Sequence, residues 1–383
     1  MIKPIFVLFL ILAVSLAKAQ NNIEAKAKQV VSQMTLEQKA ELVVGLGMKL
    51  PGMPENSNAK KDKVPGAGGN TFAIPELGIP SMVLSDGPAG VRIDPFRNED
   101  SSRPYYATAW PVATLLASTW DTSLAKRMGV AFGSEIHDYG IDIILAPAMN
   151  IQRNPLGGRN FEYYSEDPVV AGNMAAAIVN GIQSNGVGAT IKHFVGNNEE
   201  TNRMTLNTIL SERALREIYL KGFEIAVKKS HPWAVMSSYN KINGTYTSEE
   251  YNLLTTILRK EWGFKGMVMS DWFGGTDPVA QMKAGNDLLM PGLPSQTKAI
   301  LEAVKNGTLK ESVLNENAQR ILETVFKSPA YKNYKYSDKP DLKKDATVSR
   351  TVAEEGMVLL KNRINRLSRE YLLINGVTLN HSF

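Results

Sequence analysis

The chain of 383 residues is long enough for one large domain or about two to three ordinary ones, and its 43% hydrophobic and 21% charged residues are typical of a soluble globular protein. The net charge of +5 is mild, and no dense cluster of lysines and arginines alternates with aromatic residues, so we expect no nucleic-acid partner. The absence of cysteine excludes thiolate zinc sites and thiol nucleophiles, and none of the four histidines pairs with another at metal-ligand spacing. We therefore expect no metal and no cofactor.

The first residues are typical of a secretory signal peptide. Lys3 gives a basic start, residues 5–16 form an apolar run, and Ala17-Lys18-Ala19 matches a small-x-small cleavage pattern. The run is short for a bilayer span, so an uncleaved membrane anchor is the weaker interpretation. We expect a signal peptide over residues 1–19, a secreted or periplasmic location without membrane attachment after cleavage, and a mature net charge of about +3.

Short β-rich runs alternate with amphipathic helical stretches between residues 25 and 326. Such alternation predicts a parallel sheet, either a closed eight-stranded barrel or an open doubly wound sheet. The predicted strands are 81–84, 142–145, 188–192, 234–238, 267–270 and 288–290. The predicted helices are 122–138, 170–183, 212–228, 253–262 and 296–305, the third of them with Ser211 as its N-cap.

Polar residues follow most of the predicted strands, among them Asp86, Asn150, His193, Tyr239 and Asp271. In a barrel the carboxyl ends of all strands open on one face, so these side chains would converge on one pocket, whereas an open sheet would spread them along an edge. Convergence favours the barrel. We expect an α/β fold with a (β/α)8 TIM-barrel-like domain over residues 20–327.

The sequence changes character after the predicted barrel. Residues 328–345 are polar, contain proline and are rich in lysine, which is typical of an interdomain linker. A helix is predicted over 348–360, and only one short apolar run follows it. We expect residues 346–383 to form this helix and the start of a second domain.

The segment 153–168, RNPLGGRNFEYYSEDP, combines arginines, acids and aromatic residues in a Gly-rich loop. Such a loop can present Arg159 to a hydroxylated ligand and support it with Glu162 or Asp167. Arg–Glu pairs also join loops for structural reasons alone. We expect Arg159 to contact a ligand and the acids to be mostly structural.

Lys192 and His193 close a predicted strand, and both are good donors to sugar hydroxyls. Neighbours on a regular strand point to opposite faces, so the strand must end irregularly if both side chains reach one pocket. A hydrogen-bonded core histidine is the alternative role for His193.

Two aspartates directly follow predicted strands and would lie at the mouth of a barrel. Asp271 could be the nucleophile at a glycosyl centre, with Trp272 beside it to stack on a sugar ring. Capping of the next helix is the alternative role for Asp271. Asp86, which Gly87-Pro88 would hold outward, could accept hydrogen bonds from two sugar hydroxyls, and a turn-forming role is its alternative.

Seven segments together resemble the family 3 glycoside hydrolases of the β-glucosidase and β-xylosidase type, in family order and with family spacing. The resemblance implies a (β/α)8-like barrel followed by an α/β sandwich domain, and hydrolysis with retention through a covalent glycosyl-enzyme. The matching segments are MTLEQKAELV (34–43), SDGPAGVR (85–92), GRNFEYYSEDP (158–168), KHFVGNNEETNR (192–203), SSYNKING (237–244), FKGMVMSDW (264–272) and EEGMVLLKN (354–362).

The same resemblance implies the site residues. Asp271 matches the catalytic nucleophile, and Trp272 resembles the residue that flanks the leaving-group subsite. The resemblance makes the expected partner a β-linked oligosaccharide or glycoside, with glucose as the expected terminal sugar and xylose as the alternative. The positions that bind the non-reducing sugar are matched by Asp86, Arg159, Lys192, His193, Arg203 and Tyr239.

The chain departs from the family in its proton donor. Single-domain members carry an Asp and a His shortly after a KHFPG-type segment, and KHFVGNNEETNRM has neither. In two-domain members the acid/base glutamate comes from the second domain, and we hypothesise that this chain is a truncated or frame-shifted copy. It should attack a dinitrophenyl glucoside slowly and leave natural disaccharides untouched. A non-catalytic sugar-binding remnant and an unrelated barrel enzyme are the alternatives.

Overall fold

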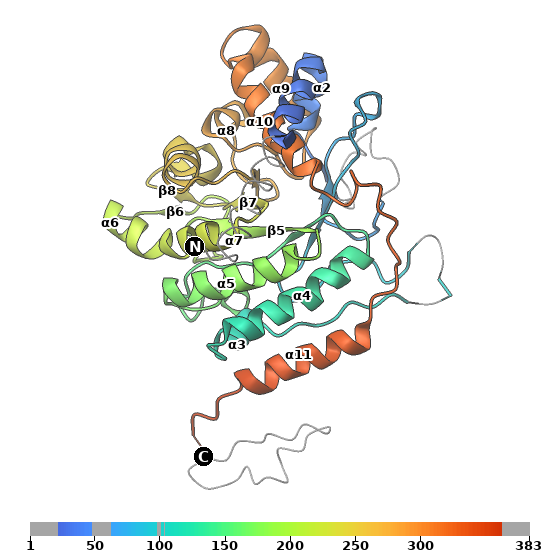
Figure 1. Ribbon diagram of the computed structural model, residues 1–383. Coiled ribbons are helices and arrows are strands. Elements are labelled where there is room, and N and C mark those ends of the chain that lie inside the picture. The colour runs from blue at the N-terminus through green and yellow to red at the C-terminus, as the bar shows by residue number, and fades with distance from the viewer. Residues whose placement is uncertain (1–21, 48–62, 98–100, 103, 362–383) are drawn as a thin grey trace, which may run out of the picture.

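The computed structural model describes residues 22–47, 63–97, 101–102 and 104–361, and a curved sheet organises them (Figure 1). Neighbouring strands from the third to the last run parallel, while the second strand is antiparallel to both of its neighbours. The order in the sheet is β1 (Leu46–Gly47), β2 (Gly69–Asn70), β3 (Val83–Asp86), β4 (Ile143–Leu145), β5 (Gly188–Phe194), β7 (Ala234–Ser237) and β10 (Met267–Ser270).

The sheet closes on itself through residues 288–290. Leu288 pairs with Met269 of β10, and Leu289 pairs with Val44 just before β1, both in parallel. The last strand and the first are thereby joined, which gives a barrel-like ring rather than an open doubly wound sheet. The prediction of a closed barrel-like sheet, as opposed to an open one, is confirmed.

The reversed direction of β2 corrects the expectation of an all-parallel (β/α)8 barrel. A parallel connection needs a crossover of about a dozen residues or more, usually with a helix. Between β2 and β3 the chain forms only the 3₁₀ turn Pro75–Leu77, so it turns back beside its own strand. Residues 288–290, predicted as a strand, contribute only isolated bridges.

Helices cover the outside of the barrel. Aspartates begin several of them by accepting backbone N–H groups: Asp121 before α4, Asp167 before α5 and Asp277 before α8. Ser211 caps α6 as predicted. Besides residues 22–33, the helices are α2 (Leu36–Leu42), α3 (Ala113–Ala117), α4 (Thr122–Asp138), α5 (Pro168–Gln183), α6 (Glu212–Ala214), α7 (Lys221–Ser230), α8 (Pro278–Ala284), α9 (Pro294–Lys305), α10 (Glu311–Val325) and α11 (Leu342–Gly356), with π-helical turns at Leu215–Tyr219 and Asn252–Glu261.

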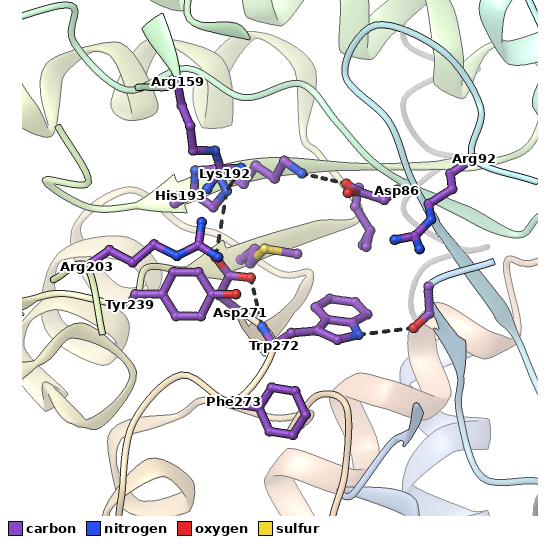
Figure 2. A pocket seen from close by; sticks show the side chains of 13 residues that line it. Asp86, Arg92, Arg159, Lys192, His193, Arg203, Tyr239, Asp271, Trp272 and Phe273 are labelled. Carbon is purple, nitrogen blue, oxygen red and sulfur yellow. Dashed lines mark hydrogen bonds and ion pairs between the residues drawn. The ribbon is translucent and has the colours of Figure 1, made fainter. Parts of the chain in front are cut away.

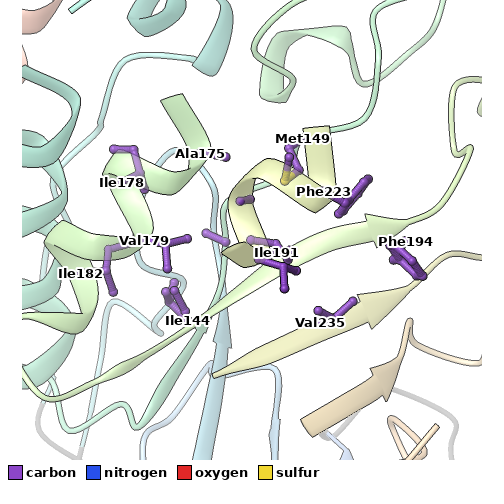
Figure 3. Packing of buried hydrophobic residues seen from close by; sticks show 14 of the residues in the cluster. Ile144, Met149, Ala175, Ile178, Val179, Ile182, Ile191, Phe194, Phe223 and Val235 are labelled. Carbon is purple, nitrogen blue, oxygen red and sulfur yellow. The ribbon is translucent and has the colours of Figure 1, made fainter. Parts of the chain in front are cut away.

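The strands bury alternate residues in two hydrophobic clusters. Ile144, Ile191 and Val235 belong to the cluster that packs against α5 and α7 (Figure 3). Their neighbours Ile143 and Met236 belong to the second cluster. This two-residue alternation is what a strand with both faces covered requires, and it fixes the register in which the strand ends meet.

The C-terminal helix differs from its predicted range of 348–360. It starts earlier, at Leu342, because the Asp341 side chain accepts the Lys344 N–H at 3.1 Å. It ends at Gly356, where an added Cβ would lie 2.3 Å from the Leu115 carbonyl oxygen. Val352 is buried in the first cluster, and α11 lies beside α3 and α4 (Figure 1).

The predicted signal peptide and the residues from 362 onward lie outside the described residues, so the signal peptide and the second domain stay predictions. Residues 328–345 are described, but their role as an interdomain linker depends on the second domain and also stays a prediction. Part of the predicted linker contacts the barrel, since Asp338 pairs with Arg97 at 2.5 Å and its N–H reaches the Asp138 carbonyl at 2.9 Å. None of the helices in the described ranges has the length and apolar character needed to span a membrane.

Candidate active site

The carboxyl ends of the strands surround a pocket of about 460 Å³ (Figure 2). All eight residues predicted from the sequence line it, although they come from segments far apart in the chain. The lining consists of Gly68, Asp86, Arg92, Leu145, Arg159, Lys192, His193, Arg203, Met236, Tyr239, Asp271, Trp272 and Phe273.

Asp271 follows β10 directly and is 7% exposed. Its backbone is fixed because its N–H reaches the Ser237 carbonyl at 3.2 Å and its own carbonyl accepts the Gly274 N–H at 2.9 Å. Its Oδ1 accepts the Trp272 N–H at 2.8 Å, and the nearby Tyr239 hydroxyl also stabilises the ionised carboxyl. Oδ2 has no partner of ordinary hydrogen-bond geometry among the described residues. The next helix, α8, is capped by Asp277, so the helix-cap alternative for Asp271 is wrong.

Burial raises the pKa of Asp271 from 3.8 to about 6, although the charges of Lys192 and Arg159 oppose the shift. A buried carboxylate is costly when it is not fully hydrogen-bonded. The group is nevertheless ionised for the most part at neutral pH. An ionised carboxylate with one free oxygen at the inner end of a pocket is well suited to attack an electrophilic carbon.

His193 is 1% exposed and neutral. Burial and the charges of Arg159 and Lys192 lower its pKa well below 6.5. Arg159 Nη2 lies 2.9 Å from Nε2 of His193, and because a guanidinium only donates, Nε2 accepts and the proton is on Nδ1. Nδ1 then faces Asn150 Oδ1 at 3.2 Å, so the contact of 3.7 Å between Nε2 and Asp271 Oδ2 is not an ion pair.

Lys192 and Asp86 form an ion pair across the pocket, with 2.8 Å between Nζ and Oδ1. The register between β5 and β7 shifts between Ile191 and Phe194, which confirms the predicted irregular strand end and lets the adjacent Lys192 and His193 both reach the pocket. Burial opposes ionisation of Asp86, but the charge and hydrogen bond of Lys192 outweigh it and lower the pKa of Asp86.

The two arginines on the opposite side are held by glutamates. Arg159 pairs with Glu162 through its Nε, and Arg203 Nη1 donates to Glu200 Oε2 at 2.9 Å. The Arg203 guanidinium also lies 4.7 Å from the centre of the Tyr239 ring. Glu162 is thus structural, as predicted, and Glu200 is a positioning residue that the sequence analysis missed.

The remaining wall is apolar. Trp272 donates from Nε1 to the Gly68 carbonyl at 3.1 Å, and a Cβ on Gly68 would approach the indole to 3.3 Å, so this glycine lets the indole come close to the backbone. Arg92 and Phe273 also line the pocket and were not singled out from the sequence. The sequence motifs could have indicated both residues, because Arg92 is the last residue of SDGPAGVR and Phe273 directly follows Trp272.

Polar donors and acceptors along one side and an aromatic face on another fit a ring that carries several hydroxyl groups. Among the described residues, the carboxyls that line the pocket are those of Asp86 and Asp271. Lys192 lowers the pKa of Asp86, so Asp86 is unsuited to donate a proton, and the carboxyl of Asp271 is the one left with an oxygen open to a ligand.

Comparison with known proteins identifies the family. Residues 76–324 match the model of the glycosyl hydrolase family 3 N terminal domain. The chain belongs to glycosyl hydrolase family 3. It is 44% identical over 338 residues to thermostable beta-glucosidase B of Acetivibrio thermocellus, a match that covers 88% of the chain and 42% of that relative. It is also 40% identical over 341 residues to an exo-alpha-(1->6)-L-arabinopyranosidase of Bifidobacterium longum, covering 87% of the chain and 41% of the relative.

Among solved structures, this family 3 chain is similar to beta-glucosidase 3B from Thermotoga neapolitana in complex with alpha-D-glucose. The TM-score is 0.84 at 55% sequence identity, over 88% of this chain and 47% of the other. The chain thus spans less than half the length of these relatives.

Proposed function

We propose that the chain carries the sugar-binding and nucleophilic part of a retaining β-glucosidase. Asp271 attacks the anomeric carbon of a terminal β-D-glucosyl residue and forms a covalent glycosyl-aspartate, which water then hydrolyses. The observation that carries the proposal is the free Oδ2 of Asp271, buried in a pocket with His193, Arg159 and Lys192. The beta-glucosidase names of several relatives support glucose as the sugar.

The surrounding side chains have distinct roles in the proposal. Asp86 accepts hydrogen bonds from sugar hydroxyls, while Lys192 neutralises it and donates to a neighbouring hydroxyl. Arg159 donates to hydroxyls near the anomeric carbon, and neutral His193, whose Nε2 accepts from Arg159, helps to hold that guanidinium in place. Because these groups are already held by protein contacts, little ordering is needed when the sugar binds.

Proton donation limits which bonds the described site can break. A poor leaving group needs a general acid, whereas dinitrophenolate leaves without one. Asp86 is unsuited to this role because Lys192 lowers its pKa. We therefore propose that the described site by itself cleaves activated glucosides and leaves cellobiose intact, with hydrolysis of the intermediate as the slow step.

Hydrolysis of 2,4-dinitrophenyl β-glucoside by the wild type and by Asp271→Ala tests the proposal. The wild type should release a burst of dinitrophenolate stoichiometric with enzyme, and the variant should be slower by about 10³-fold or more. Equal rates would contradict it. Binding of glucose without any burst would instead favour a sugar-binding protein that does no chemistry.

The terminal sugar is tested with the same leaving group on different glycones. Dinitrophenyl β-xyloside lacks only the hydroxymethyl group, and an activated α-L-arabinopyranoside probes the activity named for one relative. The proposal predicts the highest kcat/KM for the glucoside. A higher value for either of the other two would change the assigned sugar but not the chemistry.

A further inference from the structure

The proposed chemistry leaves one wall of the pocket without a role. Phe273 lines the pocket directly after Trp272, and 39% of its surface is exposed. Trp272 packs against the second hydrophobic cluster, but Phe273 belongs to neither of the two clusters. Core packing therefore does not explain a large apolar side chain at this position.

The backbone of Phe273 is in the left-handed region, with a φ of 65°. This conformation disfavours a bulky residue, because its Cβ comes close to the following carbonyl oxygen, and glycine or asparagine is the usual choice. Unfavourable conformations of this kind gather at functional sites, where the surrounding structure holds them in place.

The turn that carries Phe273 is held by three hydrogen bonds. The Phe273 N–H reaches the Met290 carbonyl at 2.9 Å, and the Gly274 N–H reaches the Asp271 carbonyl at 2.9 Å. Gln281 Nε2 donates to the Gly274 carbonyl at 2.8 Å. The aromatic ring is therefore presented on a fixed turn, which reduces the ordering needed when a ligand packs on it.

Exposure increases along the three residues that begin with Asp271. Asp271 is buried, Trp272 is partly buried and Phe273 is exposed. Figure 2 shows Phe273 beyond Trp272, away from Asp86 and Lys192. A sugar whose anomeric carbon reaches Asp271 would therefore place its leaving group, rather than its own ring, next to Phe273.

We infer that Phe273 is a specificity-determining residue that binds the leaving group as an apolar platform for a flat ring. The ring is an aromatic aglycone or the apolar face of a second pyranose. The inference rests on the proposed function. A leaving group without a ring, such as fluoride, gains nothing from this contact.

Two trapping reagents with the same sugar and different leaving groups test the inference. 2-Deoxy-2-fluoro-β-D-glucosyl fluoride and 2,4-dinitrophenyl 2-deoxy-2-fluoro-β-D-glucoside both transfer their glycosyl group to the Asp271 carboxylate. The bond to the anomeric carbon breaks and expels fluoride or dinitrophenolate, neither of which needs a proton. The labelling rate with each reagent is followed by the mass of the intact chain.

Phe273→Asn removes the ring and keeps a residue that tolerates the left-handed backbone. We expect labelling by the dinitrophenyl reagent to slow about fivefold, roughly the contribution of one aromatic contact, and labelling by the fluoride to be unchanged. Phe273→Tyr keeps the ring and should match the wild type with both reagents. Tyr251→Ala removes an exposed ring that lines none of the described pockets and should change neither rate.

Equal effects of Phe273→Asn on both reagents, or no effect on either, would overturn the role of Phe273 while leaving the glycosidase proposal intact. No labelling of the wild type by either reagent would overturn both. A competition experiment separates the aromatic aglycone from the second pyranose. Phenyl thioglucoside or thiocellobiose is added during labelling, and the protection of Asp271 against the reagent is measured. The variant should weaken protection by at least one of them, and unchanged protection by both would contradict the inference.

Discussion

Two buried aspartates with different surroundings lie beside the two ends of β10, Asp287 at the amino end and Asp271 at the carboxyl end. At the amino end, Asp287 is fully buried, and its Oδ2 accepts from Arg259 at 2.6 Å and from the Val268 N–H at 2.8 Å. Its Oδ1 accepts from Arg320 Nε at 2.7 Å. At the carboxyl end, the Asp271 carboxyl is stabilised by the Trp272 N–H and the Tyr239 hydroxyl, and no arginine or lysine pairs with its Oδ2, which has no partner of ordinary hydrogen-bond geometry among the described residues.

The difference separates a structural charge cluster from a functional one. Burial penalises the charged form at both ends, since it lowers the pKa of Arg259 to about 10 and raises that of Asp271 to about 6. At the amino end the penalty is offset by paired charges, so removing one partner should damage the fold. At the carboxyl end the pairing is incomplete, which leaves an oxygen available to a substrate.

The largest effect that we expect from this comparison is a loss of stability at the amino end of β10. Asp287→Asn leaves Arg259 and Arg320 without their shared anion, and should lower the free energy of unfolding by about 3–5 kcal/mol. Urea denaturation at neutral pH measures this. The matched control is Glu316→Gln, which removes an exposed partner 3.7 Å from Arg320 and should cost less than about 1 kcal/mol.

Folded Asp287→Asn should still be labelled at Asp271 at the wild-type rate, because the two aspartates lie at opposite ends of the strand. An Asp287→Asn variant as stable as the wild type, or a folded one that is no longer labelled at Asp271, would contradict the division into a structural and a functional charge cluster.

Loss of Asp86 should show the opposite pattern. Asp86→Asn removes the charged acceptor for sugar hydroxyls, and labelling efficiency with the fluoride reagent should fall by about 10²-fold. Stability should fall less than in Asp287→Asn, because Asp86 is partly exposed, although Lys192 loses its partner. Glu166→Gln, an exposed acid in a loop that lines none of the described pockets, is the control and should leave labelling unchanged.

The pH dependence is the smallest expected effect. Only ionised Asp271 attacks, so the labelling rate should fall about tenfold per pH unit below pH 6 and level off above pH 7. Because the folded pKa is raised, the contribution of Asp271 to stability is present below pH 3.8 and lost as the pH rises through about 6. Asp271→Asn should therefore stabilise the chain more at pH 7 than at pH 4, and a labelling rate independent of pH between 5 and 7 would contradict the assigned pKa.

The sequence predicted what depends on local pattern. The strand at 267–270 and the helix Thr122–Asp138 have the predicted bounds, because a continuous apolar run and a 3.6-residue period identify them. The pocket residues were found because polar residues follow apolar strands within recognisable motifs. Their convergence required only that the strands be parallel and the sheet closed.

What the sequence did not predict depends on contacts between distant segments. β1 and β2 have two residues each, too few to show a period, and the direction of β2 follows from a connection that contains no crossover helix. The end of α11 at Gly356 is set by Leu115, far away in the chain. Glu200 is the exception, because it holds Arg203 from only three residues away and this local pair was nevertheless not predicted.

The most direct test of the account is the location of the covalent label. After treatment with 2-deoxy-2-fluoro-β-D-glucosyl fluoride and digestion with trypsin, the added mass should lie on Asp271, in the peptide that begins at Gly266. Label on another carboxyl such as Asp86, or no label on the folded chain, would contradict the assignment of Asp271 as the nucleophile.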